Sequence, residues 1–222
     1  MNPLRSVLTD IEGTTTALTF VHDILFPLSS AQMETFVRQN WDTNPHVKAV
    51  KDEVSASSVD AVVEVLRKWI KEDRKHRELK AIQGQIWKRG FESGELKGHV
   101  YPDVAENFKK WSSAGIRVFI FSSGSVDAQK MIFSHSTSGD LSPYISGYFD
   151  TAVGAKKEAG SYLNIASTVG IKPEDILFLS DVVIELDAAR SAGMQTTHLN
   201  RDFIISGGSH TSVNTFDQIA VS

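Results

Sequence analysis

A short apolar run near the N-terminus stops abruptly at two acidic residues. The run holds Leu4, Val7 and Leu8, and the segment after it is Asp10-Ile11-Glu12-Gly13-Thr14-Thr15. This pattern is typical of a buried strand followed by a loop, and ligands of open parallel sheets lie at that end of the strands. Because side chains at i and i+2 of an extended segment point the same way, Asp10 and Glu12 are predicted to face one site. For this segment alone, an ordinary turn that uses Asp and Gly explains the pattern equally well.

From Val100 onward, apolar strands alternate with helical segments. Strands are predicted at 116–121, 149–153, 176–179 and 195–199, and helices at 102–111, 161–169 and 185–192. Strands that alternate with crossover helices indicate an α/β fold with a doubly wound parallel sheet. Polar residues follow the strands, and in a parallel sheet all of these strand ends lie along one edge. They are Asp10 and Glu12, then Ser122 and Ser123, then Lys156, then Asp181.

Residues 16–99 have the apolar spacing of helices and no alternating strand pattern. Helices are predicted after Ser29-Ser30, after Ser57-Ser58, and through Leu79 to Trp87. Basic and acidic residues are interleaved over 67–80, which is typical of a solvated helical face and disfavours nucleic-acid binding. This helical segment is predicted to be an insertion into the α/β domain.

The composition narrows the possible chemistry. The chain has 222 residues, 41% of them hydrophobic, and a formal net charge of −4, which also argues against a dedicated nucleic-acid binder. The absence of cysteine excludes disulfides, thiolate zinc sites and cysteine nucleophiles. We expect a monomer that is not bound to a membrane, because the sequence has no bilayer-length apolar stretch, no basic leader and no heptad pattern.

The polar strand ends together are what phosphoryl transfer through an aspartyl-phosphate requires. Asp10 is the expected nucleophile, and Ser122 and Ser123 with nearby backbone N–H groups can bind a phosphate. Lys156 would offset charge on the phosphoryl oxygens, while Asp10 and Asp181 would hold Mg²⁺, which prefers oxygen ligands. Taken singly, Lys156 is better explained as half of an exposed pair with Lys157, and Ser122 to Ser125 as a loop that caps a helix; only the four strand ends together favour the functional interpretation.

These residues resemble the motifs of the haloacid-dehalogenase superfamily of aspartate-nucleophile phosphatases. Glu12 stands where that superfamily usually has Asp, and this change is the signature of one family within it, the enolase-phosphatases of methionine salvage, also called acireductone synthases. The likeness covers nearly the whole chain. It includes Phe20-Val21, Gln83-Gly84 with Trp87, Ser122-Ser123-Gly124-Ser125-Val126, Gly154-x-Lys156-x-Glu158 and Phe178-Leu179-Ser180-Asp181. Near the C-terminus the family usually has Arg-Pro-Gly-Asn, whereas this chain has Asn200-Arg201-Asp202-Phe203.

The resemblance implies a Rossmann-like catalytic core formed by residues 1–15 and 100–222, with residues 16–99 as a helical cap. It implies a two-step reaction in which 2,3-diketo-5-methylthiopentyl-1-phosphate is enolised and then dephosphorylated to 1,2-dihydroxy-3-keto-5-methylthiopentene. Asp10 would attack phosphorus, and Glu12 would act as general acid and base. One Mg²⁺ would be bound by the carboxylates of Asp10 and Asp181 and the backbone carbonyl of Glu12. Ser122, Ser123 and Lys156 would bind the phosphorylated small-molecule substrate. The base for enolisation stays open between Glu12 and a cap residue.

The same resemblance implies a cytoplasmic enzyme, and in a eukaryote a nuclear one as well. A general phosphomonoesterase of the same superfamily is the competing enzyme hypothesis, since the cap sets the choice of substrate. A catalytically silent scaffold is the competing hypothesis from another class, and the retention of every motif residue argues against it.

Overall fold

The computed structural model describes residues 4–201 and 207–221, and the chain forms two compact units. Unit 1 combines Met1–Leu18 with Lys97–Ser222, and unit 2 is Thr19–Leu96. The chain therefore leaves unit 1 once, forms unit 2, and returns. Each unit has a hydrophobic core of its own.

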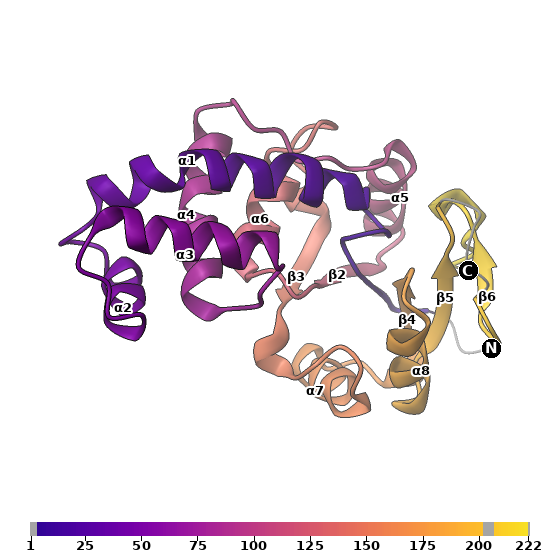
Figure 1. Cartoon of the computed structure of the whole chain (residues 1–222). Coiled ribbons are helices and arrows are strands. Elements are labelled where there is room, and N and C mark those ends of the chain that lie inside the picture. Colours follow the sequence, from indigo (N-terminus) through magenta and orange to yellow (C-terminus); the bar gives the residue numbers. More distant parts are fainter. Residues whose placement is uncertain (1–3, 202–206, 222) are drawn as a thin grey trace. The chain divides into compact units, whose positions relative to one another are not determined.

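Unit 1 is built on a parallel sheet that is six-stranded within the described residues (Figure 1). Its strands are β1 (Ser6–Thr9), β2 (Arg117–Phe121), β3 (Ile145–Phe149), β4 (Ile176–Ser180), β5 (Gln195–Leu199) and β6 (Thr211–Val213). Their order is β3-β2-β1-β4-β5-β6, and all neighbours run parallel. The predicted doubly wound sheet is thus confirmed. The strand order reverses beside β1, which is where ligands of such sheets bind.

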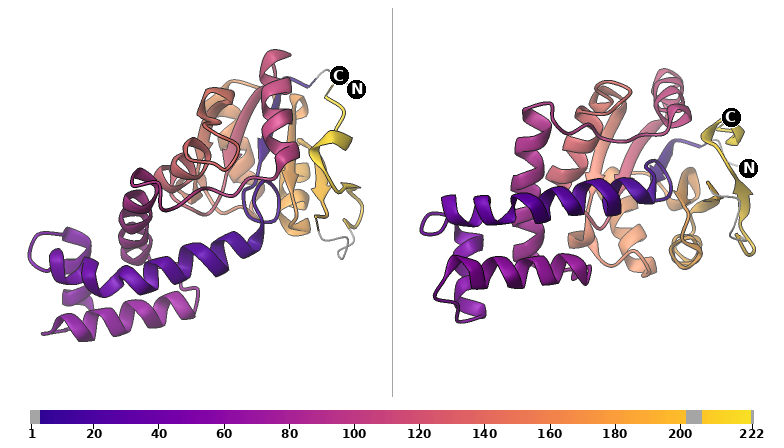
Figure 2. Two further views of the ribbon diagram at one scale, coloured as in Figure 1. Left: turned by 90° about the horizontal axis from the view of Figure 1, so that it is seen from above. Right: turned by 45° about the horizontal axis from the view of Figure 1, so that its top comes forward.

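Helices cover both faces of this sheet, as two further views show (Figure 2). They are α5 (Pro102–Ser113), α6 (Val126–Ser134), α7 (Ala159–Val169) and α8 (Val183–Ser191). One core joins α5 and α6 to one face, and a second core joins α7 and α8 to the other. In β1, Val7 packs into the first core and its neighbour Leu8 into the second, and both are fully buried. The central strand is therefore covered on both faces, which explains why all four of its residues are buried.

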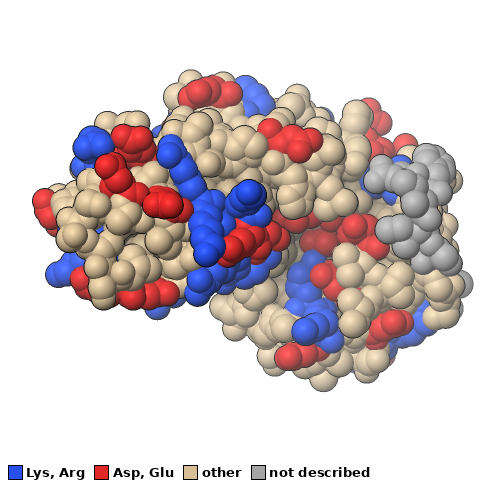
Figure 3. All heavy atoms as spheres, viewed as in Figure 1, with Lys and Arg blue, Asp and Glu red and all other residues tan. Residues whose placement is uncertain are grey.

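Unit 2 is helical throughout its regular structure. It consists of a π-helical turn at Phe20–Leu25 followed by α1 (Phe26–Gln39), α2 (Pro45–Glu53), α3 (Val59–Lys71) and α4 (Arg77–Glu92). Residues from all four α-helices form one apolar core. On the face shown in Figure 3, acidic and basic side chains are interspersed over this unit. No helix among the described residues is long and apolar enough to span a membrane.

The structure of unit 2 differs from the sequence predictions in three places. The first helix does not begin after Ser29-Ser30 but at Phe26, because Ser29 is buried within the helix and its hydroxyl donates to the Phe26 carbonyl. Helix α2 was missed, although Asn44 caps it by accepting from two backbone N–H groups and Pro45 occupies its first position. The basic run over 67–80 is also not one face, since it spans the end of α3 and the start of α4.

Two further differences lie in unit 1. The strand predicted at 149–153 is displaced towards the N-terminus, because β3 ends at Phe149 and Asp150 caps a short 3₁₀ turn. The tail, in which no strand was predicted, contributes β6 and another 3₁₀ turn, Phe216–Gln218. Asp202 and Phe203 of the divergent C-terminal stretch lie outside the described residues.

Candidate active site

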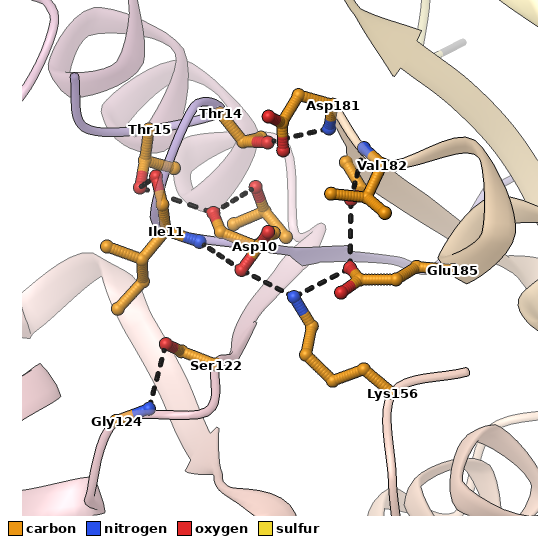
Figure 4. Close-up of polar contacts among 12 residues, drawn as sticks. Asp10, Ile11, Thr14, Thr15, Ser122, Gly124, Lys156, Asp181, Val182 and Glu185 are labelled. Carbon is orange, nitrogen blue, oxygen red and sulfur yellow. Dashed lines mark hydrogen bonds and ion pairs between the residues drawn. The ribbon is translucent and has the colours of Figure 1, made fainter. Parts of the chain in front are cut away.

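Polar side chains from four strand ends gather at the carboxyl edge of the sheet (Figure 4). Asp10 follows β1, Ser122 follows β2 and Asp181 follows β4, while Lys156 comes from the loop after β3. The chain brings them together because every strand of the sheet runs in the same direction. A cluster of this kind was predicted from the sequence.

Lys156 is the centre of the cluster, since its ammonium lies between two carboxylates. Its Nζ is 2.7 Å from Asp10 Oδ1 and 2.7 Å from Glu185 Oε2. Burial on its own would lower the pKa of Lys156, but the two carboxylates outweigh it and the pKa is raised. The ammonium therefore stays charged at neutral pH.

The loop that carries Lys156 is held against the start of α7. The Tyr162 hydroxyl donates to the Lys156 carbonyl at 2.6 Å, and the Ser161 hydroxyl donates to the Ala155 carbonyl at 2.7 Å. Gly154 has a φ of 128°, and a Cβ at this position would lie 2.3 Å from Ser161 Oγ. Only glycine allows this approach, so the Gly-x-Lys spacing has a steric cause.

The segment after β1 forms a tight turn that fixes Asp10. The Ile11 N–H donates to Asp10 Oδ1 at 2.7 Å, and three successive N–H groups, from Thr14 to Thr16, donate to the Ile11 carbonyl. Gly13 has a φ of 74°, and a Cβ there would lie 2.2 Å from Asp181 Oδ2. Asp181 is thus packed directly against the turn, and its N–H donates to Thr14 Oγ1 at 3.1 Å.

Asp181 fits the role of a cation ligand. Its Oδ1 is buried and has no hydrogen-bond partner among the described residues. Burial, and then the charge of Asp10, raise the pKa of Asp181 to about 7. A carboxylate in this position needs a cation or a proton. No group of three or more acidic, His or Cys side chains suited to a metal occurs in the described part. Mg²⁺ does not require one, because it often takes one or two carboxylates together with water.

The other predicted site residues lie close to these groups in the chain. Ser122 is 4% exposed, and its hydroxyl accepts from the Gly124 N–H at 3.2 Å. Ser123 is half-buried, and Ser125 caps α6 by accepting from the Ala128 N–H. Glu12 is half-buried within the turn and forms a β-bridge with Thr16. The serine loop therefore leads into a helix N-terminus, an arrangement that suits an anion.

Sequence reasoning missed Glu185. It lies in the first turn of α8, four residues after Asp181, and its Oε2 accepts from the Ser180 hydroxyl at 3.0 Å. Burial, and then the charge of Asp10, raise the pKa of Glu185. The available signal was an acid in the first turn of the helix that begins two residues after Asp181.

His198 was also missed. Its imidazole is buried on β5, with Nε2 3.1 Å from the Asp181 carbonyl. Burial lowers the pKa of His198, and since a carbonyl only accepts hydrogen bonds, Nε2 is the nitrogen that carries the proton. Its Nδ1 lies 3.0 Å from Ser212 Oγ on β6. His198 thus supports the backbone of Asp181 from behind the site.

Comparison with known proteins places this site in a family. A family model described as haloacid dehalogenase-like hydrolase matches residues 4–193. The chain is 49% identical to enolase-phosphatase E1 of Pseudomonas fluorescens, over 97% of each protein. It is 50% identical to enolase-phosphatase E1 of Marinobacter nauticus, over 90% of this chain and 89% of that protein.

Solved structures share the fold of this chain. The crystal structure of the UTR4 protein of Saccharomyces cerevisiae is similar, with a TM-score of 0.84 and 34% identity over 97% of this chain and all of that one. CbbY of Rhodobacter sphaeroides, solved with phosphate, has a TM-score of 0.62 at 13% identity over 97% of this chain and 96% of that one. At that identity the likeness to CbbY concerns the fold alone.

The raised pKa of Asp181 predicts how the stability of the metal-free protein depends on pH. The pKa of Asp181 is about 7 in the folded state, against 3.8 for an unperturbed Asp side chain. Between these two pH values the folded state therefore binds more protons at Asp181 than the unfolded state does. The free energy of unfolding should therefore fall as pH rises from about 4 to about 7, by on the order of 1 kcal/mol per pH unit. Urea unfolding in a chelator, compared with Asp181→Asn, measures this slope.

Asp181→Asn should give a flatter profile, and the part of the slope that remains belongs to Glu185, whose pKa is shifted in the same direction. Asp52→Asn removes an exposed carboxylate in unit 2 and serves as the control, with the slope of the wild type. Parallel profiles for the wild type and Asp181→Asn would contradict the assignment.

Proposed function

The chain belongs to the enolase-phosphatase E1 family of haloacid dehalogenase-like hydrolases, and from that premise we propose the reaction that it catalyses. It enolises 2,3-diketo-5-methylthiopentyl-1-phosphate and hydrolyses the enol phosphate to 1,2-dihydroxy-3-keto-5-methylthiopentene and phosphate. This makes it the acireductone synthase of methionine salvage from methylthioadenosine. We further propose that it works as a monomer in the cytoplasm, and also in the nucleus if the cell is eukaryotic.

The observation that carries this proposal is the ammonium of Lys156 between Asp10 and Glu185. It pairs with the Asp10 carboxylate at the carboxyl end of the central strand, where a nucleophile can meet a phosphoryl group. The Ile11 N–H fixes the plane of the same carboxylate. Lys156 can also offset negative charge on the phosphoryl oxygens as the reaction proceeds.

Hydrolysis then proceeds in two displacements. A carboxylate oxygen of Asp10 forms a bond to phosphorus while the bond from phosphorus to the substrate oxygen breaks, and Glu12 gives its proton to that leaving oxygen. Glu12, now a carboxylate, takes a proton from water as the water oxygen attacks the aspartyl-phosphate. Phosphate leaves and Asp10 is restored. Ser122 and Ser123, in the loop that leads into α6, bind the phosphate oxygens throughout.

The metal proposed for this site is Mg²⁺. The carboxylates of Asp10 and Asp181 and the backbone carbonyl of Glu12 would hold it, and the unpartnered Oδ1 of Asp181 supports this assignment. When bound, Mg²⁺ would neutralise phosphoryl charge and acidify the proton next to the diketone. Either Glu12 or a residue of unit 2 removes that proton in the enolisation step.

We propose that residues 16–99 act as the cap that selects the substrate. Within unit 2, a cavity of about 420 Å³ lies between the start of α1 and the end of α3. Phe26, Pro27 and Ile70 give it an apolar wall, and its charged lining residues are Arg67, Lys71 and Asp73. The apolar wall suits a short apolar chain, such as the methylthioalkyl part of the substrate.

A coupled assay tests the reaction as a whole. The diketo phosphate is supplied with and without Mg²⁺, and acireductone absorbance and released phosphate are followed together. Both products should rise together in the wild type and require Mg²⁺, and Asp10→Asn should release no phosphate, because it has lost its nucleophile. Phosphate release from generic esters with the diketo phosphate left untouched would show that the substrate assignment is wrong. In the same assay, a Glu12→Gln variant that enolises at full rate would assign the base to unit 2.

Glu185→Gln tests the positioning of Lys156. The variant removes one of the two carboxylates that hold the ammonium, so kcat should fall roughly 10- to 100-fold, as for other partners that orient catalytic groups. Glu174→Gln, an exposed carboxylate weakly paired at 4.0 Å with Lys172, is the matched control and should retain activity. Equal kcat values for Glu185→Gln and the wild type would show that Glu185 does not position Lys156 for catalysis.

Phe26→Ala tests the cavity of unit 2. Loss of this apolar wall should raise KM for the diketo phosphate about 10-fold, corresponding to about 1.4 kcal/mol of lost burial, and leave hydrolysis of an aryl phosphate unchanged. Trp41→Ala removes another partly buried aromatic ring of unit 2, one that does not line this cavity. If both variants change KM alike, the cavity does not select the substrate.

A further inference from the structure

Arg201 lies in the stretch that departs from the family pattern, and it joins three segments of unit 1. Its Nε donates to the Thr14 carbonyl at 3.0 Å, and Nη1 donates to Asp103 Oδ2 at 2.7 Å and to the Asn214 carbonyl at 3.2 Å. The side chain is 7% exposed, and its guanidinium carbon lies 4.3 Å from the centre of the Tyr101 ring. Its contacts thus connect the turn after β1 with the start of α5 and with β6.

The contact with Thr14 links Arg201 to the candidate metal site. Thr14 is fully buried and is held at both ends: its carbonyl accepts from Arg201, and its Oγ1 accepts from the Asp181 N–H at 3.1 Å. Thr14 belongs to the turn that begins at Asp10. A displacement of Thr14 therefore changes the separation of the Asp10 and Asp181 carboxylates.

This part of the site has little free space. A single added carbon at Gly13 would lie within 2.2 Å of Asp181 Oδ2. Close-packed groups transmit small displacements instead of absorbing them. A shift of the Thr14 carbonyl would therefore also shift Asp181.

Anchoring of the C-terminal segment alone does not account for Arg201. Arg190 on α8 already holds that segment, donating to Ser209 Oγ at 2.7 Å and to the Ser209 carbonyl at 3.2 Å. Burying Arg201 also costs folding free energy, because its Nη2 has no hydrogen-bond partner among the described residues. Within this pair, it is Arg201 that makes the contact with the turn after β1.

We propose that Arg201 is a positioning residue that sets the affinity of the Mg²⁺ site, by holding the Thr14 carbonyl and with it the spacing of Asp10 and Asp181. The inference rests on the metal site proposed above. Arg201 donates no hydrogen bond to the carboxylate of Asp10 or of Asp181 within the described part of the chain, so its effect is on geometry. Bound metal holds the two carboxylates together by itself, so saturating Mg²⁺ should replace the action of Arg201.

Arg201→Lys is the test, because lysine keeps the charge and can still pair with Asp103 but lacks the planar group that reaches Thr14 at the same time. Calorimetric titration with MgCl₂ alone should show binding about 10-fold weaker than in the wild type. With an aryl phosphate, the Mg²⁺ concentration for half-maximal rate should rise by the same factor, while kcat at saturating Mg²⁺ and KM for the ester stay unchanged.

Arg190→Lys is the matched control, since it loosens the same C-terminal segment without touching the turn, and its Mg²⁺ affinity should equal that of the wild type. Equal affinity in Arg201→Lys and the wild type would overturn the inference, as would an equal loss in both lysine variants. If Arg201→Lys does not fold, Asp103→Asn releases the guanidinium from its other side and is judged by the same criterion.

A double-mutant cycle separates the route through Thr14 from general loosening. Thr14→Val removes the acceptor for the Asp181 N–H at nearly constant volume. If Arg201 acts through Thr14, adding Arg201→Lys to Thr14→Val should weaken Mg²⁺ binding less than Arg201→Lys does alone. Full additivity would overturn the proposed route. A wild type that binds no Mg²⁺ would overturn the metal site itself, a result distinct from a wild type and an Arg201→Lys variant that bind it equally.

Discussion

The ammonium of Lys156, buried between Asp10 and Glu185, is the interaction on which the site depends. A buried charge without its partners costs several kcal/mol, so each of the three groups requires the other two. The surrounding contacts keep them together: Tyr162 and the close approach at Gly154 seat the lysine loop, and the first turn of α8 presents Glu185. Asp181 adds a further carboxylate, which leaves the cluster with excess negative charge. The proposed Mg²⁺ would balance that excess.

The sheet explains how residues so far apart in the chain meet. Strand β1 lies between β2 and β4, where the strand order reverses, and Asp10 is carried at its end. Helices on both faces bury the strands, so only the loops at the carboxyl edge are available for chemistry. The chain leaves for unit 2 shortly after the Asp10 turn and returns before α5. An insertion at that point lengthens a loop at the active edge without interrupting the sheet.

Local pattern predicted most of the elements, and its failures have local explanations. Strand β5 and helices α3 and α5 follow from apolar periodicity, with Ser58 as an N-cap and Pro102 at a first helical position. Ser29 was misread because a serine buried inside a helix and a serine at its start look alike in sequence. Strand β6 was not predicted because its Thr-Ser-Val sequence is short and polar. It is a strand only because β5 offers it an edge to pair with.

The sequence by itself determined the strand ends, and hence that Asp10, Ser122, Lys156 and Asp181 belong to one edge of a parallel sheet. In a parallel sheet the carboxyl ends of all strands lie along one edge, however far apart the strands are in the chain. Only the tertiary structure decided which groups touch: that Lys156 binds Glu185 as well as Asp10, and that Arg201 reaches Thr14. These contacts are between side chains and segments far apart in sequence, and no local preference encodes them. Each contact forms or fails with shifts of about a few tenths of an ångström. The packing of the folded chain sets such distances, whereas the periodicity of the sequence does not.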